Sequence, residues 1–333
     1  MRSKSLCVSF PDAARITLVG AFSLLALALA CGQSAAQTYP AKPIRLVVGY
    51  SPGGGTDLTA RTVAPKLSER LGQPVIVENR PGANATIGVG YVAKADPDGY
   101  TLLVGTSAEM VYALGLYERL PYDTTKDFVP VMHMTTNPLI FAVHPSLPVT
   151  SIKELIELAR AKPGKLFFAS GAAHFQATGE LFKQQAGVNI VNVSYKGAAP
   201  AVTAAVAGEV PLVVSSFSIL PQLRAGKLRA LAVTLSKRYA LLPDIPTMAE
   251  AGVPGVEVAP WTGLFAPSGT PRAIIDKLNS ELIAIYKLDD VKARFAAQGA
   301  IGEPLPLAEF SALLKTDLAK WPSLLRELNI SAK

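Results

Sequence analysis

The residues best suited to chemistry lie in a loop directly after a predicted strand. The apolar segment 44–50 (IRLVVGY) predicts the strand, and SPGGGTD (51–57) follows it, before a helical stretch. Three consecutive glycines leave the main chain without Cβ atoms, so its N–H groups can approach a ligand closely. Thr56 or Asp57 is placed to cap the helix, and a helix N-terminus favours an anion. The loop therefore indicates an anion-binding site at the carboxyl end of a strand.

Five further loops, near 81–86, 105–109, 170–174, 194–197 and 215–218, follow predicted strands and are rich in glycine, small and hydroxyl residues. Any one of them is an ordinary connection, but together they suit a carboxylate held by neutral donors. The candidate ligand-binding residues are Ser51, Gly54, Gly55, Thr56, Asp57, Asn84, Ala85, Thr86, Thr106, Ser107, Glu109, His174, Tyr195, Lys196, Ser216 and Phe217.

Four of these candidates have two interpretations. Asp57 either contacts the ligand or only caps the helix. If Glu109 faces the cleft, it would repel an acidic group of the ligand and favour an amino group. If it caps a helix or points to solvent, it has no bearing on the choice of ligand. Lys196 either pairs with a second ligand carboxylate or braces its loop with the ammonium in solvent. His174 is either a ligand contact or a structural residue.

Catalytic machinery is not indicated. The GxSxG spacing of a nucleophile elbow is absent, and the glycine run has Ser-Pro where an oxyanion loop of lipases has histidine. The lysine of a P-loop is missing, and the glycine spacing does not fit a dinucleotide site. The three histidines, His133, His144 and His174, are scattered, which argues against a zinc site. We expect no catalytic residue, no metal and no cofactor.

The first 36 residues have the layout of a secretory signal peptide. Cationic residues precede an uncharged apolar run over 16–30, which is short for a membrane span, and Ser34-Ala35-Ala36 suits cleavage before Gln37. An alternative is lipidation of Cys31, although LALAC (27–31) lacks the usual leucine three positions earlier. Cleavage after Ala36 leaves no cysteine, so the exported protein must be stabilised by a core. We therefore expect a periplasmic protein.

Composition supports a globular protein with a sizeable core. The 333 residues are 50% hydrophobic and 17% charged, and the length suggests two domains. Loss of the predicted signal peptide lowers the formal charge from +7 to +5, and the remaining charges are dispersed. Such a surface attracts anions but is not a nucleic-acid footprint.

Short β-branched runs alternate with helical stretches, which predicts parallel sheets with crossover helices. The predicted strands are 44–50, 74–78, 100–104, 139–143, 166–169, 190–194, 211–215, 229–234 and 261–267. The predicted helices are 57–71, 86–95, 151–161, 175–186, 198–207, 218–225, 271–287, 289–298 and 307–329, with Pro65 and Pro322 expected to kink or break two of them. The stretch 120–131 reads as a turn-rich link.

The domain organisation follows from the last three predicted helices. They have no sheet of their own to cover, so we expect the chain to return to its first domain. This predicts a discontinuous lobe of 37–138 plus 261–333 and a continuous lobe of 139–260. Two α/β lobes joined by crossing strands form a cleft that suits hinge closure around a ligand.

The chain resembles the tripartite tricarboxylate transporter (TTT) substrate-binding proteins, the Bug or TctC family of periplasmic receptors, across essentially all residues after 36. The resemblance is carried by YPAKPIRLVVGYSPGGGTD (39–57), VIVENRPGANATIG (75–88), ADPDGYTLL (95–103), LPYDTTKDFVPV (120–131), GELF (179–182), VSYKGAAPA (193–201), LRALAVTLSKRYALLPDIPTMAEAG (228–252) and WTGLFAPSGTP (261–271). In combination these motifs are highly specific.

The resemblance implies a two-lobed periplasmic-binding-protein (Venus-flytrap) fold, each lobe a mainly parallel sheet flanked by helices. It implies a monomeric receptor that captures a small organic carboxylate or amino acid and delivers it to TTT membrane permease subunits. The alternative is a sensory receptor for a membrane histidine kinase; a secreted hydrolase is a third, weaker hypothesis. The family's carboxylate grip maps onto 54–57 and 84–86, which predicts that Gly54→Val abolishes binding.

Three departures from the family pattern bear on the ligand. Asn84-Ala85 stand where glycines are frequent, Glu109-Met110 where small or hydroxyl residues are usual, and Gln176 near where many relatives carry histidine. These departures put the simplest dicarboxylates in doubt. Dicarboxylates, tricarboxylates, aromatic carboxylates, nicotinate-like acids and acidic amino acids all stay open.

Overall fold

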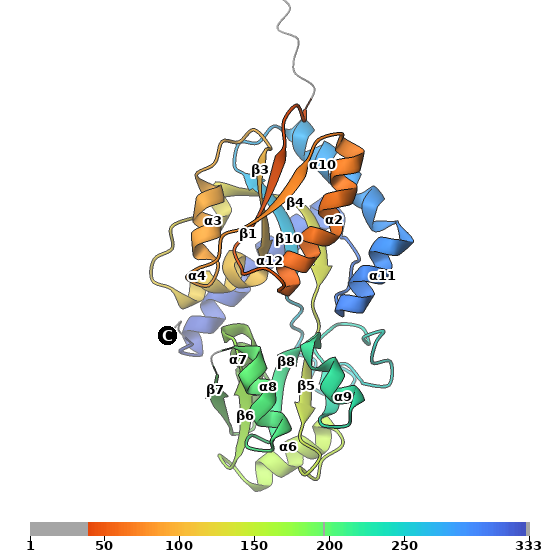
Figure 1. The fold of residues 1–333 in the computed structure, drawn as a ribbon. Helices are drawn as coiled ribbons and strands as arrows, with labels where there is room; N and C mark the ends of the chain where they lie inside the picture. Colours follow the sequence, from red (N-terminus) through yellow and green to blue (C-terminus); the bar gives the residue numbers. More distant parts are fainter. Residues whose placement is uncertain (1–38, 196, 331–333) are drawn as a thin grey trace, which may run out of the picture. The chain divides into compact units, whose positions relative to one another are not determined.

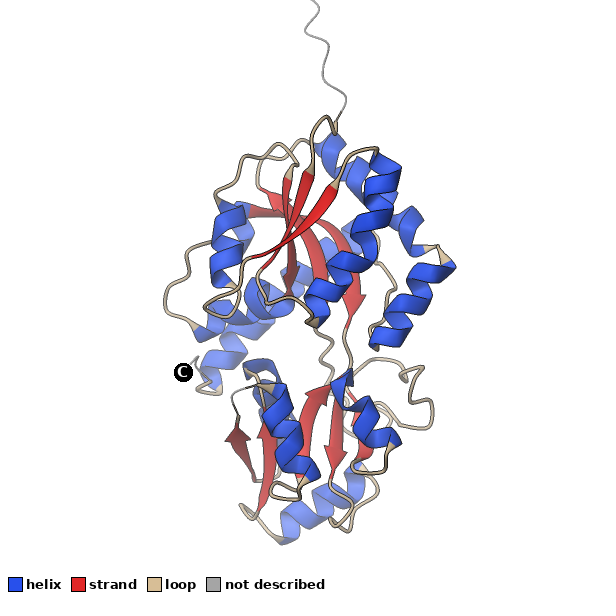
Figure 2. Ribbon diagram, viewed as in Figure 1, coloured by secondary structure: helices blue, strands red, loops and turns tan. Residues whose placement is uncertain are grey.

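The structure is a computed structural model that describes residues 39–195 and 197–330. The predicted signal peptide, Cys31 and Lys196 lie outside the described residues. Two five-stranded sheets, each flanked by helices, are formed within residues 42–330 (Figures 1 and 2). No helix in the described part of the chain is long and apolar enough to cross a membrane.

The first sheet has the strand order β2-β1-β3-β10-β4. Only β10 runs antiparallel to its neighbours, because it is formed by the chain on its return from the second sheet. The strands are β1 (Ile44–Val48), β2 (Val75–Asn79), β3 (Thr101–Thr106), β4 (Phe128–Thr136) and β10 (Trp261–Pro267). The flanking helices are α2 (Gly55–Leu71), α3 (Thr86–Ala93), α10 (Arg272–Tyr286), α11 (Asp289–Gln298) and α12 (Leu307–Glu327).

The second sheet has the order β7-β6-β8-β5-β9, with β5 as its only reversed strand. Its strands are β5 (Leu139–Val143), β6 (Leu166–Ser170), β7 (Ile190–Ser194), β8 (Leu212–Ser216) and β9 (Arg229–Val233). Its helices are α6 (Ile152–Ala161), α7 (Ala173–Ala186), α8 (Ala198–Val206), the 3₁₀ turn η2 (Phe217–Ile219) and α9 (Leu220–Arg224). The expectation of mainly parallel strands in each sheet is therefore confirmed.

The two faces of the second sheet are covered by different helices. In β5, Phe141 and Val143 pack in one hydrophobic cluster with residues of α6 and α7, whereas Ile140 and Ala142 pack in another with residues of α8 and α9. Successive side chains of a strand point to opposite faces. A sheet covered on both sides thus needs a continuous apolar run, which is why LIFAV (139–143) carried a clear strand signal.

The C-terminal helices pack on the first sheet. Helix α10 contacts α2 and β4, and α12 contacts β4 and the short helix α4 (Ala113–Leu116). The Phe310 ring lies 5.2 Å from Trp261 and 5.6 Å from Phe265, measured between centroids. The last helices thus pack on the sheet that contains the first strands. The lobe boundaries at 138/139 and 260/261 stay predictions.

Several short elements were not predicted. Strand β4 begins inside the stretch read as a link, after the one-turn helix α5 (Thr124–Asp127), and β3 is followed by a π-helix, η1 (Ala108–Tyr112). The predicted helix 218–225 is divided into η2 and α9. The helical pieces α5, η1 and η2 have only three to five residues, too few for a periodic pattern to emerge, whereas β4 has nine and was read as part of a link.

Two helices contain a proline, and two others begin at residues with local hydrogen bonds. Neither Pro65 nor Pro322 ends its helix: α2 and α12 run on past them, because packing outweighs the propensity of one residue. The N-cap of α10 is Pro271, and the preceding residue, Thr270, donates its hydroxyl to the carbonyl of Pro267. The N-cap of α6 is Ser151, whose Oγ accepts the Glu154 N–H at 3.2 Å.

The buried His133 predicts acid-sensitive stability. It lies in β4, fully buried, and burial lowers its pKa to about 4 from the ordinary 6.5. The unfolded chain therefore binds the extra proton first as the pH falls, so the contribution present at neutral pH is lost between pH 6.5 and 4. We expect His133→Phe to flatten the pH dependence of the free energy of unfolding by up to about 1.4 kcal/mol per pH unit. Urea unfolding at several pH values measures this, and parallel curves would contradict it.

Candidate functional site

A cavity of about 510 Å³ lies at the carboxyl ends of strands from both sheets. Its size is that of a small-molecule site. Asn137 and Pro260, from the two segments that link the sheets, also line it, and the Asn137 N–H donates to the Pro260 carbonyl at 2.7 Å. The lining residues important here are Tyr50, Gly55, Thr56, Thr106, Ser107, Asn137, Gly171, His174, Ala198, Ser216, Phe217, Pro260, Trp261 and Gln298.

The beginnings of several helices line this cavity. Helix α2 starts at Gly55, α7 starts at Ala173 between the lining residues Ala172 and His174, and α8 starts at Ala198. The first N–H groups of a helix have no intrahelical partner and carry partial positive charge. In α2 the first intrahelical bond is donated by Leu58 N to Gly54 O, so the N–H groups of residues 55–57 precede it. Three such ends in one cavity favour an anion.

The cavity wall is neutral. None of the described residues that line it is Lys, Arg, Asp or Glu. The polar groups on the wall are hydroxyls, amides, main-chain groups and the His174 imidazole. Burial lowers the pKa of His174 to about 4, so this ring is uncharged at neutral pH. An anion in the cavity would be held by dipoles and hydrogen bonds and not by a lysine or arginine of the described wall.

Asp57 holds the glycine loop in place from behind. Its carboxylate is 1% exposed and accepts the Gly53 N–H at 2.8 Å, the Asn79 amide at 2.8 Å and the Arg61 guanidinium at 2.9 Å. Asn79, the last residue of β2, also donates to the Tyr50 carbonyl. Asp57 therefore joins the end of β1 and the loop to the start of α2. It is not the N-cap that was one of the two expectations, because Gly54 occupies that position.

The charge of Asp57 is stabilised where it lies. Burial raises the pKa of its carboxyl, but the hydrogen bonds from Arg61, Gly53 and Asn79 together outweigh burial and lower it below the ordinary value. The loop is thus anchored by an ionised group at neutral pH.

The loop before α3 has an unusual backbone. Ala83, Asn84 and Ala85 all have positive φ, of 45°, 51° and 73°. This left-handed region costs a non-glycine residue about 1 kcal/mol or more. The Asn84 amide donates to the Tyr117 hydroxyl at 2.5 Å, and the Thr86 hydroxyl donates to the Ala83 carbonyl at 2.8 Å. These side chains support the loop itself.

Glu109 is neither in solvent nor on the cavity wall. It lies in η1, is 1% exposed and accepts the Tyr50 hydroxyl at 2.7 Å. It also accepts the Thr106 N–H at 2.6 Å and the Thr106 hydroxyl at 2.5 Å. Burial raises the pKa of Glu109, although these hydrogen bonds oppose the shift. Both donors, Tyr50 and Thr106, line the cavity, and Glu109 lies directly behind these two wall residues.

In the second sheet, the site residues lie where β6, β7 and β8 end. The His174 ring stacks on Tyr112 with the ring centroids 5.8 Å apart. His174 therefore contacts η1, the short helix that follows β3 of the first sheet. Ser216 is the cap of η2, and its hydroxyl accepts the Ser218 N–H. Gly171 packs so tightly that an added Cβ would lie 2.2 Å from the Gly197 carbonyl oxygen. Tyr195 donates its N–H to the Ser170 carbonyl.

The predicted site residues therefore divide into three groups. Those on the cavity wall are Gly55, Thr56, Thr106, Ser107, His174, Ser216 and Phe217. Those outside the wall are Ser51, Gly54, Asp57, Asn84, Ala85, Thr86, Glu109 and Tyr195. Lys196 lies outside the described residues. Sequence reasoning missed Tyr50, Asn137, Trp261 and Gln298. Of these, only Tyr50 carried a signal, which is its position after β1 and next to the glycine loop.

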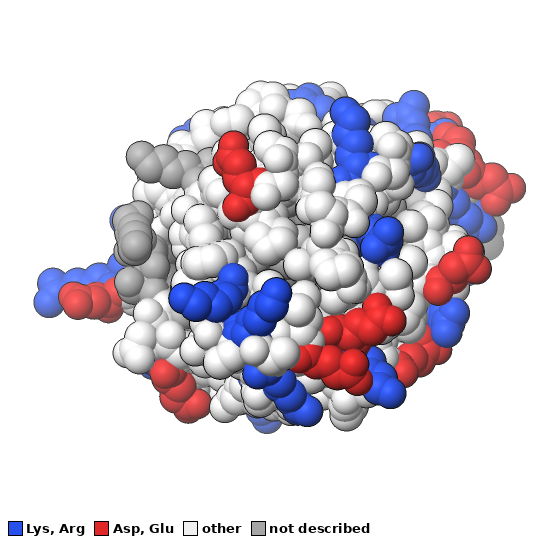
Figure 3. All heavy atoms as spheres, turned by 90° about the horizontal axis from the view of Figure 1, so that it is seen from below, with Lys and Arg blue, Asp and Glu red and all other residues white. Residues whose placement is uncertain are grey.

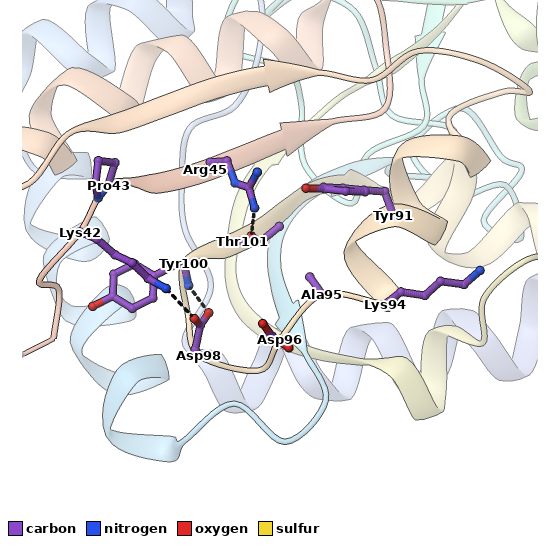
Figure 4. Close-up of a pocket in the computed structure, with 10 residues that line it drawn as sticks. All are labelled: Lys42, Pro43, Arg45, Tyr91, Lys94, Ala95, Asp96, Asp98, Tyr100 and Thr101. Atoms are coloured by element: carbon purple, nitrogen blue, oxygen red, sulfur yellow. Dashed lines mark hydrogen bonds and ion pairs between the residues drawn. The ribbon is translucent and has the colours of Figure 1, made fainter.

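A second cavity of about 500 Å³ lies at the other end of β1 and β3, where these strands begin (Figure 4). It is lined by charged and aromatic side chains that pair among themselves. Lys42 pairs with Asp98 at 3.1 Å, Arg45 donates to the Thr101 hydroxyl at 3.0 Å, and Lys42 lies 4.3 Å from the Tyr100 ring centroid. Figure 4 shows Lys94 directed away from this group. No helix of the described chain begins there, so this cavity is the weaker candidate.

The face in Figure 3 shows acidic and basic side chains interspersed around a largely uncharged area. Within residues 39–195 and 197–330, no group of three or more His, Cys, Asp or Glu residues is placed to hold a metal ion.

Comparison with known proteins agrees with the two-lobed architecture. The sequence model of the family described as "Tripartite tricarboxylate transporter family receptor" matches residues 59–329. The protein BugT of Bordetella pertussis is 37% identical over 96% of this chain and 98% of its own length.

Two similar solved structures contain a bound carboxylate according to their descriptions. "R. palustris Rpa4515 with adipate" is 36% identical, with a TM-score of 0.76, over 88% of this chain and 99% of that one. "MatC (Rpa3494) from Rhodopseudomonas palustris with bound malate" is 32% identical, with a TM-score of 0.71, over 86% of this chain and 100% of that one. The predicted fold class, a two-lobed binding-protein fold, is thereby confirmed.

Proposed function

Because the chain belongs to the tripartite tricarboxylate transporter receptor family, we propose that it captures a small organic carboxylate in the cavity between its sheets and delivers it to a TTT membrane permease. The family is one of solute receptors and not of enzymes. The protein acts in the periplasm after export, with residues 1–36 removed as a signal peptide.

One observation supports this function above the others. Three helix N-termini meet at a cavity whose described wall bears no charged side chain. A carboxylate can be held there by main-chain N–H groups and hydroxyls, which bind it without a covalent step. The two linking segments line the same cavity, so closure of the lobes about residues 137 and 260 would enclose the ligand. The relatives solved with adipate and malate fit the same ligand class.

A thermal-shift screen of residues 37–333 tests the proposal. A carboxylate present at about 100 times its dissociation constant adds roughly 2.7 kcal/mol to the folded state, which raises the melting temperature by several degrees. The panel contains dicarboxylates, tricarboxylates, aromatic acids and amino acids, and each acid is paired with its uncharged amide as a control. We expect a shift with an acid and none with its amide. Equal shifts with both, or none with any acid in ligand-free protein, would contradict carboxylate binding.

A further inference from the structure

Glu109 determines which hydrogen-bonding groups the cavity wall can offer. Tyr50 and Thr106 line the cavity, and both direct their hydroxyl hydrogens to one carboxylate oxygen, Oε2, of Glu109. The distances are 2.7 Å and 2.5 Å, in the range of charge-assisted O–H···O⁻ bonds. The other oxygen, Oε1, accepts the Thr106 N–H at 2.6 Å. Three donors on two oxygens fit an ionised carboxylate, which has acceptor sites only.

A hydroxyl group has a single hydrogen, so these two hydroxyls have none left for a ligand. The Thr106 hydroxyl is committed further, because its oxygen accepts the Ala108 N–H at 3.2 Å. Burial and the nearby Glu109 raise the pKa of Tyr50, which keeps its hydrogen in place. Any part of these two hydroxyls that a ligand reaches is therefore a hydrogen-bond acceptor. A ligand carboxylate would find no donor there.

We propose that Glu109, acting through Tyr50 and Thr106, selects ligands that carry a hydrogen-bond donor, an amino or hydroxyl group, in addition to the carboxylate. The inference rests on the proposed function, since the carboxylate itself is held at the helix N-termini. Glu109 is a positioning residue: it does not line the cavity but orients the two hydroxyls that do. The ligand class becomes hydroxy acids and amino acids.

The substitution Glu109→Gln inverts this arrangement without changing its size. The Thr106 N–H requires an acceptor, which places the amide oxygen at the Oε1 position. The amide NH₂ then faces the Tyr50 and Thr106 hydroxyls and donates one hydrogen to each, so both hydroxyls turn their own hydrogens elsewhere. The wall changes from acceptor to donor.

The test compares dissociation constants for acids that share a carbon skeleton, by isothermal titration calorimetry on the chain from residue 37. The pairs are succinate with malate or aspartate, and glutarate with 2-hydroxyglutarate or glutamate. For the skeleton that binds, we expect the unaltered protein to prefer the donor-bearing acid by about tenfold or more. In Glu109→Gln this preference should fall at least about tenfold, to parity or below. Tyr50→Phe, which removes one hydroxyl, should lower it in part.

The matched control is Glu281→Gln on α10, which removes the same charge from an ion pair with Arg70 of α2; neither residue lines the cavity. Its preference should equal that of the unaltered protein. Tyr50→Phe keeps the test valid if Glu109→Gln fails to fold. Equal affinity for both members of each pair, or a preference unchanged in the variants, would overturn the inference while leaving carboxylate binding intact. Failure of every acid to bind would overturn the proposed function and this inference with it.

Discussion

Replacement of Gly55 by valine is expected to weaken ligand binding at least about 100-fold while changing the free energy of unfolding by no more than about 0.5 kcal/mol. Gly55 is the first residue of α2 and lines the cavity, and a Cβ built on it meets no heavy atom within 4 Å. The valine Cβ would therefore lie in open space, and we expect the side chain to occupy space that the ligand needs. Titration calorimetry measures the affinity, and urea unfolding measures the stability.

Gly54→Val is the matched control. From the sequence alone, Gly54 was the position expected to abolish binding. In the structure Gly54 does not line the cavity, and its Cβ would lie 3.7 Å from the Ser51 carbonyl oxygen, an ordinary contact. We now expect a small effect at Gly54, a large one for Gly55→Val, and an intermediate one for Gly55→Ala. Equal affinities of Gly55→Val and the unaltered protein would show that the ligand is held elsewhere.

The second large effect is expected at Asp57. Asp57→Ala leaves the Gly53 N–H, the Asn79 amide and the Arg61 guanidinium without their common acceptor. Loss of a buried acceptor of this kind costs about 2–4 kcal/mol, reduced from the value of a fully buried ion pair because Arg61 is 49% exposed. Because the glycine loop loses its anchor, we also expect ligand affinity to fall about tenfold. Urea unfolding and calorimetry at pH 7 measure the two effects.

The pH dependence identifies the charge as the cause. The folded-state pKa of Asp57 is lowered, so its contribution to stability is present above the unfolded value and is lost as the pH falls through the folded one. The difference in unfolding free energy between Asp57→Asn and the unaltered protein should therefore shrink below about pH 4. Asp276→Ala is the control, because it breaks the exposed Arg272–Asp276 pair, whose two residues are also four apart. A difference in unfolding free energy that does not change with pH would argue against the anchoring role of Asp57. An equal loss of stability in Asp276→Ala would argue against it as well.

The sequence by itself determined the secondary structure that has a clear period. The strands 139–143, 190–194 and 261–267 and the helix 289–298 were predicted with the bounds that the structure shows. A strand covered on both faces needs a continuous apolar run, and a helix on one face of a sheet needs an apolar stripe, so both leave local patterns. The family motifs added the two-lobed fold and the receptor class.

Local patterns failed where a conformation depends on distant neighbours. Alanine does not signal positive φ, yet Ala83 and Ala85 adopt it in the loop before α3. The proline rule placed a kink or a break at Pro322, and α12 is not broken there. The residue is buried, and a Cβ added to Gly115 would lie 2.8 Å from the Pro322 carbonyl oxygen. In both places tertiary packing outweighs the preference of the single residue.

Only the tertiary structure decided which residues of each loop reach the cavity. The glycine loop was evident from its composition, but a one-residue step along the start of α2 separates Gly54 from the cavity wall and places Gly55 on it. The partner of Glu109, Tyr50, lies 59 positions earlier in the chain, and Trp261 and Gln298 enter the wall from the returning segment. Composition and spacing record what a segment can form by itself. The direction of a side chain and the hydrogen bonds it makes across the chain are set only when the sheets and helices have packed together.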